Sequence, residues 1–236
     1  MMVSMLGSVV VYSYLAAYAF AATVPIGHSG NLTVAFLSNE LGDSCDINAT
    51  THRLALTTQT IPNSYTCFNV SDIFSQSNTT GFTNATQHVY NTDEPNGIFW
   101  RLESEGSYDS QTNYSRVWYE QYAPGNIQVG ENASWVVYFY AFPDCKQLNP
   151  EKGDADPDLN PWFEDSCQTE PGGQCRTTPY SVKSFAINAA EDYNKGHGGC
   201  ETWAYQGSSG ASSFSQPSRT VSVILGGLAM IVTTLW

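Results

Sequence analysis

Two glutamates, Glu103 and Glu120, are the first residues in this sequence whose type and spacing could do chemistry. Each lies at the end of a run in which apolar and polar residues alternate, so both are expected on one sheet face, together with Trp118. A glycosidase uses two carboxylates as acid and nucleophile, and an aromatic ring can carry the sugar. The E-x-D-x-x-E pattern of one large β-sandwich glycosidase family is absent. Hydrolysis is therefore an alternative, and we assign no catalytic residue.

A second candidate is the acidic segment Asp154 to Asp165, which places oxygen-bearing side chains at positions 1, 3, 5, 7 and 12 of a calcium loop. Position 6 is Leu159, where such a loop needs glycine for its sharp turn, and Pro157 stiffens position 4. We expect a solvated acidic loop here, with a calcium site as the alternative.

A third candidate, His28, could bind copper through its amino group and ring only as the first residue of a processed chain. Cleavage after Gly27 would be required, whereas Ala19-Phe20-Ala21 is a better signal-peptidase pattern. The four histidines are scattered and no C-x-x-C occurs. The sequence thus predicts no metal and no cofactor.

The elements that must position these residues are expected to be short strands, because apolar residues recur with period two in runs rich in β-branched and aromatic types. Ser134–Phe142 is apolar on both faces, which is typical of a central strand. One short helix is expected within Ala186–Lys195. The pattern predicts an all-β fold, an antiparallel β-sandwich or Greek-key domain stabilised by disulfides. The seven expected strands are Leu32–Leu37, Arg53–Thr58, Tyr65–Val70, Gly97–Glu103, Ser115–Glu120, Ser134–Phe142 and Tyr180–Ile187.

Two of these strands, Gly97–Glu103 and Ser115–Glu120, are expected to pair. An antiparallel register that sets Arg101 opposite Glu120 also sets Glu105 opposite Arg116, which gives two cross-strand pairs of opposite charge. On this interpretation the charges are structural.

The cysteines predict three disulfides, because their number is even and a secreted chain meets an oxidising compartment. The six are Cys45, Cys67, Cys145, Cys167, Cys175 and Cys200. Fifteen pairings are open in principle. We expect Cys45 to pair with Cys67, since they are the only two in the N-terminal half, and leave the other four unassigned.

Seven N-x-S/T sequons predict a glycoprotein, because so many in one secreted chain exceed chance. They begin at Asn31, Asn48, Asn69, Asn78, Asn84, Asn113 and Asn132. The region from Asp144 to Tyr205 has none and is expected to be comparatively bare. A sugar-binding platform built from Trp162, Tyr180 or Trp203 is an alternative role for that region.

The two ends of the chain indicate processing. Residues 1–21 have the pattern of a signal peptide, and residues 22–205 are expected to form one extracellular β-rich domain. Residues 206–220 form a Ser/Gly-rich stretch, followed by an apolar tail over 221–236. This is the layout of a glycosylphosphatidylinositol (GPI) signal, with Ser209 as the expected attachment residue and the tail removed. A short membrane span or a buried strand is the alternative for the tail.

With these features the chain resembles the GPI-anchored surface glycoproteins of filamentous fungi. The resemblance implies attachment to the outer leaflet of the plasma membrane, or transfer to wall polysaccharide, and a structural or binding role. A cell-wall carbohydrate-active enzyme or a sugar-binding module is the alternative function. A net charge of −13 argues against nucleic acid as a partner.

Overall fold

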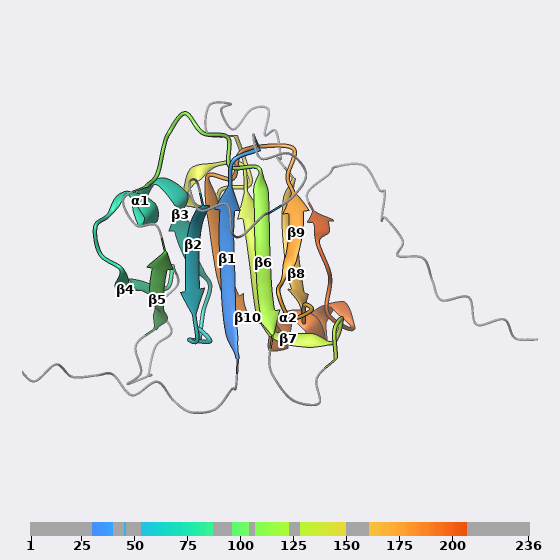
Figure 1. The fold of residues 1–236 in the computed structure, drawn as a ribbon. Helices are drawn as coiled ribbons and strands as arrows, with labels where there is room; N and C mark the ends of the chain where they lie inside the picture. Colours follow the sequence, from blue (N-terminus) through green and yellow to red (C-terminus); the bar gives the residue numbers. More distant parts are fainter. Residues whose placement is uncertain are drawn as a thin grey trace, which may run out of the picture.

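Two antiparallel sheets packed face to face make up the computed structural model (Figure 1). It describes residues 30–39, 45, 53–86, 96–103, 107–122, 128–149 and 161–206. Sheet A contains, in spatial order, β4 (Thr80–Asn84), β5 (Gly97–Glu103), β2 (Arg53–Thr58), β1 (Asn31–Leu37), β6 (Arg116–Tyr122) and β9 (Gln174–Thr177). Sheet B contains β11 (Ala204–Gln206), β8 (Trp162–Cys167), β7 (Asn132–Tyr140), β10 (Ser184–Ala189) and β3 (Thr66–Asn69). The expected disulfide-stabilised all-β sandwich is confirmed.

The core lies between the sheets because each strand presents alternate apolar residues to the facing layer. Phe36 of β1 contacts sheet B directly, with its ring 5.0 Å from that of Phe185 and 6.3 Å from that of Phe139. All three rings are fully buried. Burial of each such side chain stabilises the fold by about 1.5–3 kcal/mol.

All seven expected strands are present, and β2 and β5 have the expected bounds. Ser134–Phe142 is confirmed as central, since β7 lies in the middle of sheet B. Four strands were not expected, namely β4, β8, β9 and β11.

In the described part of the chain, the strands are connected by short helical segments that include α1 (Val70–Ser75), the 3₁₀ turn η3 (Pro143–Cys145) and α2 (Ala190–His197). The expected helix within Ala186–Lys195 is right only in its second half, because residues 186–189 continue β10. Ala189 is extended, and α2 ends at His197, capped by Gly198, whose positive φ of 76° favours glycine. Within the described residues, no helix is long and apolar enough to cross a bilayer, and the tail over 221–236 lies outside them.

The expected pairing of β5 with β6 is wrong. In sheet A, β2 and β1 lie between these two strands, and Arg101 is opposite Thr57 and Thr80. Glu120 is opposite Thr33 of β1 instead. Neighbours in the sequence are thus separated here by strands that come earlier in the chain.

The expectation of three disulfides is confirmed, but the expected pairing of Cys45 with Cys67 is wrong. The bonds join Cys45 to Cys175, Cys67 to Cys145, and Cys167 to Cys200. Cys45 packs on the outer face of sheet A, whereas Cys67 belongs to β3 in sheet B. Because the neighbouring Phe68 faces the core, Cys67 lies on the outer face of sheet B, and the whole thickness of the sandwich separates it from Cys45, which exceeds the reach of a disulfide.

Candidate functional site

The glutamates Glu103 and Glu120 do not form a catalytic pair. Three strand spacings separate β5 from β6, which is about 14 Å across the sheet, whereas glycosidase carboxyl groups lie about 5–9.5 Å apart. Glu103 makes an ion pair with Arg53 at 3.6 Å, and Oε1 of Glu120 accepts a hydrogen bond from the backbone N–H of Gly172 at 2.8 Å. Both carboxylates make these contacts on the outer face of sheet A.

Trp118 is no open sugar platform either, because only 6% of its surface is exposed. It packs in a small apolar cluster with Ala35, Leu37, Ala55 and Cys45. Its indole N–H donates to the carbonyl of Gly172 at 3.1 Å, and the Arg53 guanidinium lies 5.3 Å from the ring. The outer face of sheet A is therefore closed around this ring.

The acidic segment is only partly described, since residues 150–160 are outside the described residues. Its last part is β8, so the expectation of a solvated loop is wrong for Glu164 and Asp165, which are 5% and 1% exposed. Asp165 points into the sandwich, where Cys167 and Trp203 donate backbone hydrogen bonds to it at 3.4 and 3.2 Å. Burial raises the pKa of Asp165 to about 7.

A calcium loop cannot use Asp165 as its twelfth ligand while that carboxylate lies in the core. Among the described residues, no group of three His, Cys, Asp or Glu side chains could hold a metal ion. His28 lies outside them.

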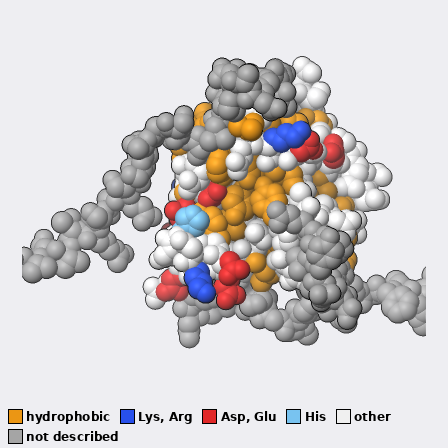
Figure 2. Space-filling view, turned by 180° about the vertical axis from the view of Figure 1, so that it is seen from behind, with side chains coloured by type: hydrophobic (Ala, Val, Ile, Leu, Met, Phe, Trp, Pro, Cys, Tyr) orange, Lys and Arg blue, Asp and Glu red, His pale blue; other side chains and the backbone are white. Residues whose placement is uncertain are grey.

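The best candidate site is the outer face of sheet B, which we call the aromatic face. Figure 2 views the molecule from behind, and a patch of hydrophobic side chains occupies its centre, with acidic and basic groups at the margin. One histidine lies at this margin, and His197 of α2 is the sole histidine of the described part of the chain. The aromatic face consists of Tyr65, Tyr138, Tyr140, Trp162 and Tyr193, with Glu164 and Glu201.

The rings of the aromatic face form a continuous chain of contacts. Tyr138 lies 5.5 Å from Tyr65 and 6.1 Å from Tyr193, and Tyr140 lies 6.4 Å from Trp162. The Tyr65 hydroxyl donates to the Tyr140 hydroxyl at 2.8 Å. All except Tyr140 are only half-buried, so the rings remain available to a ligand.

Two carboxylates meet at one phenol on this face. The Tyr193 hydroxyl contacts Glu164 and donates to Glu201 at 2.7 Å, and Trp162 Nε1 donates to the other oxygen of Glu164 at 2.6 Å. The His197 ring stacks on Tyr193 at 4.1 Å. Both oxygens of Glu164 are thus engaged, whereas Glu201 is less buried.

Burial raises the pKa of Glu164, and hydrogen bonds from Tyr193 and Trp162 oppose that shift. Burial, followed by hydrogen bonding to the two carboxylates, raises the pKa of the Tyr193 phenol far above its ordinary value. Burial also raises the pKa of Tyr140, to about 12. The phenols of this face therefore stay protonated and can donate hydrogen bonds at physiological pH.

This arrangement suits a ligand that offers both apolar C–H faces and hydroxyl groups. Aromatic rings present a rigid apolar surface with a polar edge, and carboxylates accept hydrogen bonds from hydroxyls. One oxygen of Glu164 accepts from the Trp162 indole N–H, the other shares the single Tyr193 hydroxyl proton with Glu201, and the side chain is only 5% exposed, so burial keeps this carboxylate away from a reacting carbon. The geometry favours binding over covalent chemistry.

Of the three expected platform residues, only Trp162 lies on the aromatic face. Tyr180 and Trp203 pack against the core, with Trp203 stacked on Phe163 at 4.8 Å and the Tyr180 hydroxyl bonded to the carbonyl of Phe139. Sequence reasoning missed Tyr193 and Glu201, which reach the site from α2 and the loop after it. Trp162 and Glu164 are two residues apart, a spacing that places both on one face of a strand, and this pattern could have indicated part of the site.

None of the seven sequon asparagines belongs to the residues that make up the aromatic face. Asn48 is outside the described residues. Asn69 is half-buried, and its Nδ2 donates to Asp72 and Asp144 at 3.0 Å each, so the nitrogen that a sugar would occupy is engaged. The remaining five are exposed and better placed for modification, namely Asn31, Asn78, Asn84, Asn113 and Asn132.

Comparison with known proteins gives no match: no family model, curated protein or solved structure is significantly similar to the chain. The interpretation of the site therefore depends on its own geometry.

Proposed function

We propose that this chain is a secreted, N-glycosylated and GPI-anchored surface protein whose aromatic face binds carbohydrate at the plasma membrane or cell wall. The observation that carries the proposal is the chain of rings across sheet B, all half-buried except Tyr140, with two carboxylates that meet at Tyr193. Three disulfides support an oxidising compartment. Ser209 and the apolar tail over 221–236 support the anchor.

A polysaccharide is the ligand that best fits both the aromatic rings and the hydrogen-bond acceptors of this face, because each sugar ring has an apolar C–H face and a rim of hydroxyls. Trp162 and Tyr138 supply stacking surfaces on neighbouring strands β8 and β7. Glu201 supplies an acceptor at the edge of the same face. The rigid sheet holds these groups at fixed spacing, which lowers the ordering cost of binding.

The test is binding of soluble β-glucan and chitin oligosaccharides by calorimetry and on a glycan array. Trp162→Ala and Tyr138→Ala are each expected to weaken binding at least tenfold. The matched control is Phe99→Ala, which removes a ring that is 40% exposed on the outer face of sheet A. Near-ultraviolet circular dichroism checks that each variant is folded. Absence of binding to every glycan, or an equal loss with Phe99→Ala, contradicts the proposal.

A second candidate is hydrolysis of the same polysaccharides, favoured by one observation: two carboxylates approach a single hydroxyl at Tyr193. Turnover of β-glucan or chitin that is lost in Glu201→Gln would establish it. We place binding first because Glu164 is almost fully buried and one of its oxygens accepts from the Trp162 indole N–H.

The anchor is tested separately. Phospholipase specific for phosphatidylinositol is expected to release the protein from cells, and mass spectrometry is expected to find the chain ending at Ser209. Persistence of the tail over 221–236 in the cellular protein contradicts this part of the proposal.

A further inference from the structure

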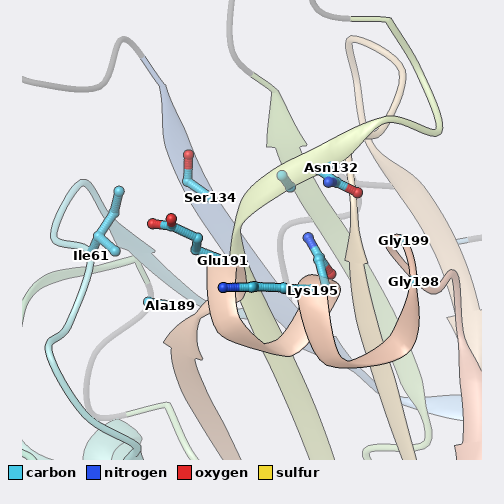
Figure 3. Close-up of a pocket in the computed structure, with 10 residues that line it drawn as sticks. Ile61, Asn132, Ser134, Ala189, Glu191, Lys195, Gly198 and Gly199 are labelled. Carbon is cyan, nitrogen blue, oxygen red and sulfur yellow. The ribbon is translucent and has the colours of Figure 1, made fainter.

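A cavity of about 550 Å³ lies between the start of β7 and helix α2, beside the aromatic face. Figure 3 shows Asn132 and Ser134 on one side, with Glu191 and Lys195 projecting from α2 across from them. Gly198 and Gly199 complete the wall beyond the helix. A volume of this size falls within the range of about 300–1,000 Å³ that small ligands occupy.

The cavity contains an unsatisfied polar side chain. Asn194 lines it and is 3% exposed, and both its Oδ1 and its Nδ2 are buried without a hydrogen-bond partner in the part of the chain that the structure describes. Buried amides are normally hydrogen bonded. The Asn194 backbone carbonyl is fully used, since it accepts from Gly198 and Gly199 at the helix end. The side-chain NH2 and carbonyl oxygen of Asn194 are therefore both without a partner in the described part of the chain and can respectively donate to and accept from a ligand.

The same cavity is lined by a sequon. Asn132 and Ser134 are the acceptor asparagine and the hydroxyl residue of the motif Asn-Ala-Ser, and Asn132 is exposed. A glycan on Asn132 would begin with N-acetylglucosamine, attached directly at the cavity wall. Its acetamido group has one carbonyl acceptor and one N–H donor. The carbonyl can accept from Nδ2 of Asn194, and the N–H can donate to Oδ1.

The remaining wall suits a sugar. Ile61 provides an apolar contact, and Glu191 and Lys195 provide polar groups for ring hydroxyls. Gly198 and Gly199 have open space where a side chain would begin. The disulfide between Cys167 and Cys200 fixes this glycine turn near β7, because Cys167 is the β-partner of Asn132.

We propose that the first sugar of an N-glycan on Asn132 is seated in this cavity and hydrogen bonded to Asn194. The inference rests on the proposed glycosylation in the secretory pathway and adds a structural role for one glycan. The docked sugar fills a cavity in the protein's own surface, whereas glycans at exposed sites such as Asn113 extend into solvent.

The test uses full-length protein secreted from a eukaryotic host. Peptide-N-glycosidase is applied to the native protein in heavy-oxygen water, and peptide mass spectrometry follows release at each sequon. Release at Asn132 is expected to be at least tenfold slower than at Asn113, the matched exposed control. In Asn194→Ala the difference is expected to disappear, while release at Asn113 is unchanged.

Thermal unfolding gives a second readout, because the Tm change caused by Asn194→Ala is expected to have opposite signs with and without the sugar on Asn132. In the glycosylated protein, Asn194→Ala is expected to lower Tm because a bond to the sugar is lost. In Ser134→Ala, which removes the sequon but keeps Asn132, the same substitution is expected to raise Tm. There it removes an unsatisfied buried amide and introduces a better helix former.

Three outcomes are distinguishable. Equal release at Asn132 and Asn113, or the same sign of the Tm change in both backgrounds, overturns the inference and leaves the proposed function intact. A sugar on Asn113 but none on Asn132 also overturns the inference alone. Absence of sugar from every sequon refutes the proposed glycosylation and the inference together.

Discussion

The aromatic residues on the outer faces of the two sheets differ in their exposure and in their neighbours. On sheet A, Trp118 is packed among small apolar residues, and the Cys45–Cys175 bond lies over them. On sheet B, Trp162 and Tyr138 are half-buried and bordered by hydrogen-bonding carboxylates. A closed ring stabilises the fold, whereas an accessible ring beside acceptors can recognise a ligand. The comparison concerns the centre of each face, since Phe99 near the edge of sheet A is 40% exposed, and it supports the proposal that sheet B carries the binding face.

The largest expected effect concerns the disulfide over sheet A. Replacement of Cys45 and Cys175 by serine is expected to lower the free energy of unfolding by about 5 kcal/mol, because the closed loop spans 130 residues. Removal of the Cys167–Cys200 bond, with a separation of 33, is expected to cost about 4 kcal/mol. Guanidinium unfolding measures both. A reversed order would show that the bond over sheet A does not stabilise that face as described.

The next effect distinguishes the buried side of β8 from its outer side. The pKa of Asp165 is about 7 in the fold and about 4 in an unfolded chain, so its contribution to stability is full below pH 4 and is lost as pH rises to about 7. Asp165→Asn removes this loss of up to about 4 kcal/mol, but its amide N–H replaces one acceptor and leaves the Cys167 or Trp203 N–H unsatisfied, at a cost of about 1–3 kcal/mol. We expect it to be about 1–3 kcal/mol more stable than the wild type at pH 8.

Urea unfolding at pH 5 and pH 8 measures this change as the difference between wild type and Asp165→Asn. The difference is expected to grow with pH. A constant difference would mean that the carboxylate is ionised in the fold across this range and that the core around Cys167 and Trp203 accommodates the charge.

A third prediction tests how tightly sheet A is closed. In Gly173→Ala the new Cβ would lie 2.7 Å from Trp118 ring carbons, at a φ of +70°, and we expect a loss of about 2–3 kcal/mol. Gly172→Ala is the matched control, since φ is +93° but nothing lies within 4 Å of the new Cβ. It is expected to cost about 1 kcal/mol. Equal losses in chemical denaturation would indicate that the packing on Trp118 is loose.

The smallest effect compares one glutamate from each face. Glu164→Gln leaves Tyr193 or Trp162 facing an amide N–H in place of an acceptor, and is expected to cost about 1–2 kcal/mol. Glu103→Gln removes an ion pair whose carboxylate side chain is 50% exposed, and is expected to cost less than about 1 kcal/mol. Parallel urea titrations decide the order, and a larger loss for Glu103→Gln would refute the distinction between the two carboxylates.

Strands with clean alternation were predictable from sequence, and strands that break it were not. In β5, Ile98, Trp100 and Leu102 face inward, so the period of two fixed both the strand and its bounds. In β8, two adjacent acidic residues suggested a loop. Asp165 is instead buried through backbone hydrogen bonds that no local pattern reveals.

Pairing and the site depend on contacts distant in sequence, which explains why they were harder to predict. The alternation of Tyr138 and Tyr140 placed both on one face of β7, but it could not show that Tyr193 and Glu201 would join them. Proximity in the sequence favoured a bond between Cys45 and Cys67, the two cysteines of the N-terminal half. The sandwich places them on opposite outer faces, and topology decides the pairing.

The disulfide pattern has a consequence for how the chain matures. Cys45 and Cys67 are synthesised first. The partner of Cys45 follows it by 130 residues, and the partner of Cys67 follows it by 78 residues. During that interval the two thiols are one short loop apart, and closing a short loop is entropically cheaper than closing a long one. Oxidation at this stage produces a bond that the finished sandwich excludes. A chain oxidised in this way reaches the native connectivity only by thiol–disulfide exchange, which takes seconds to hours.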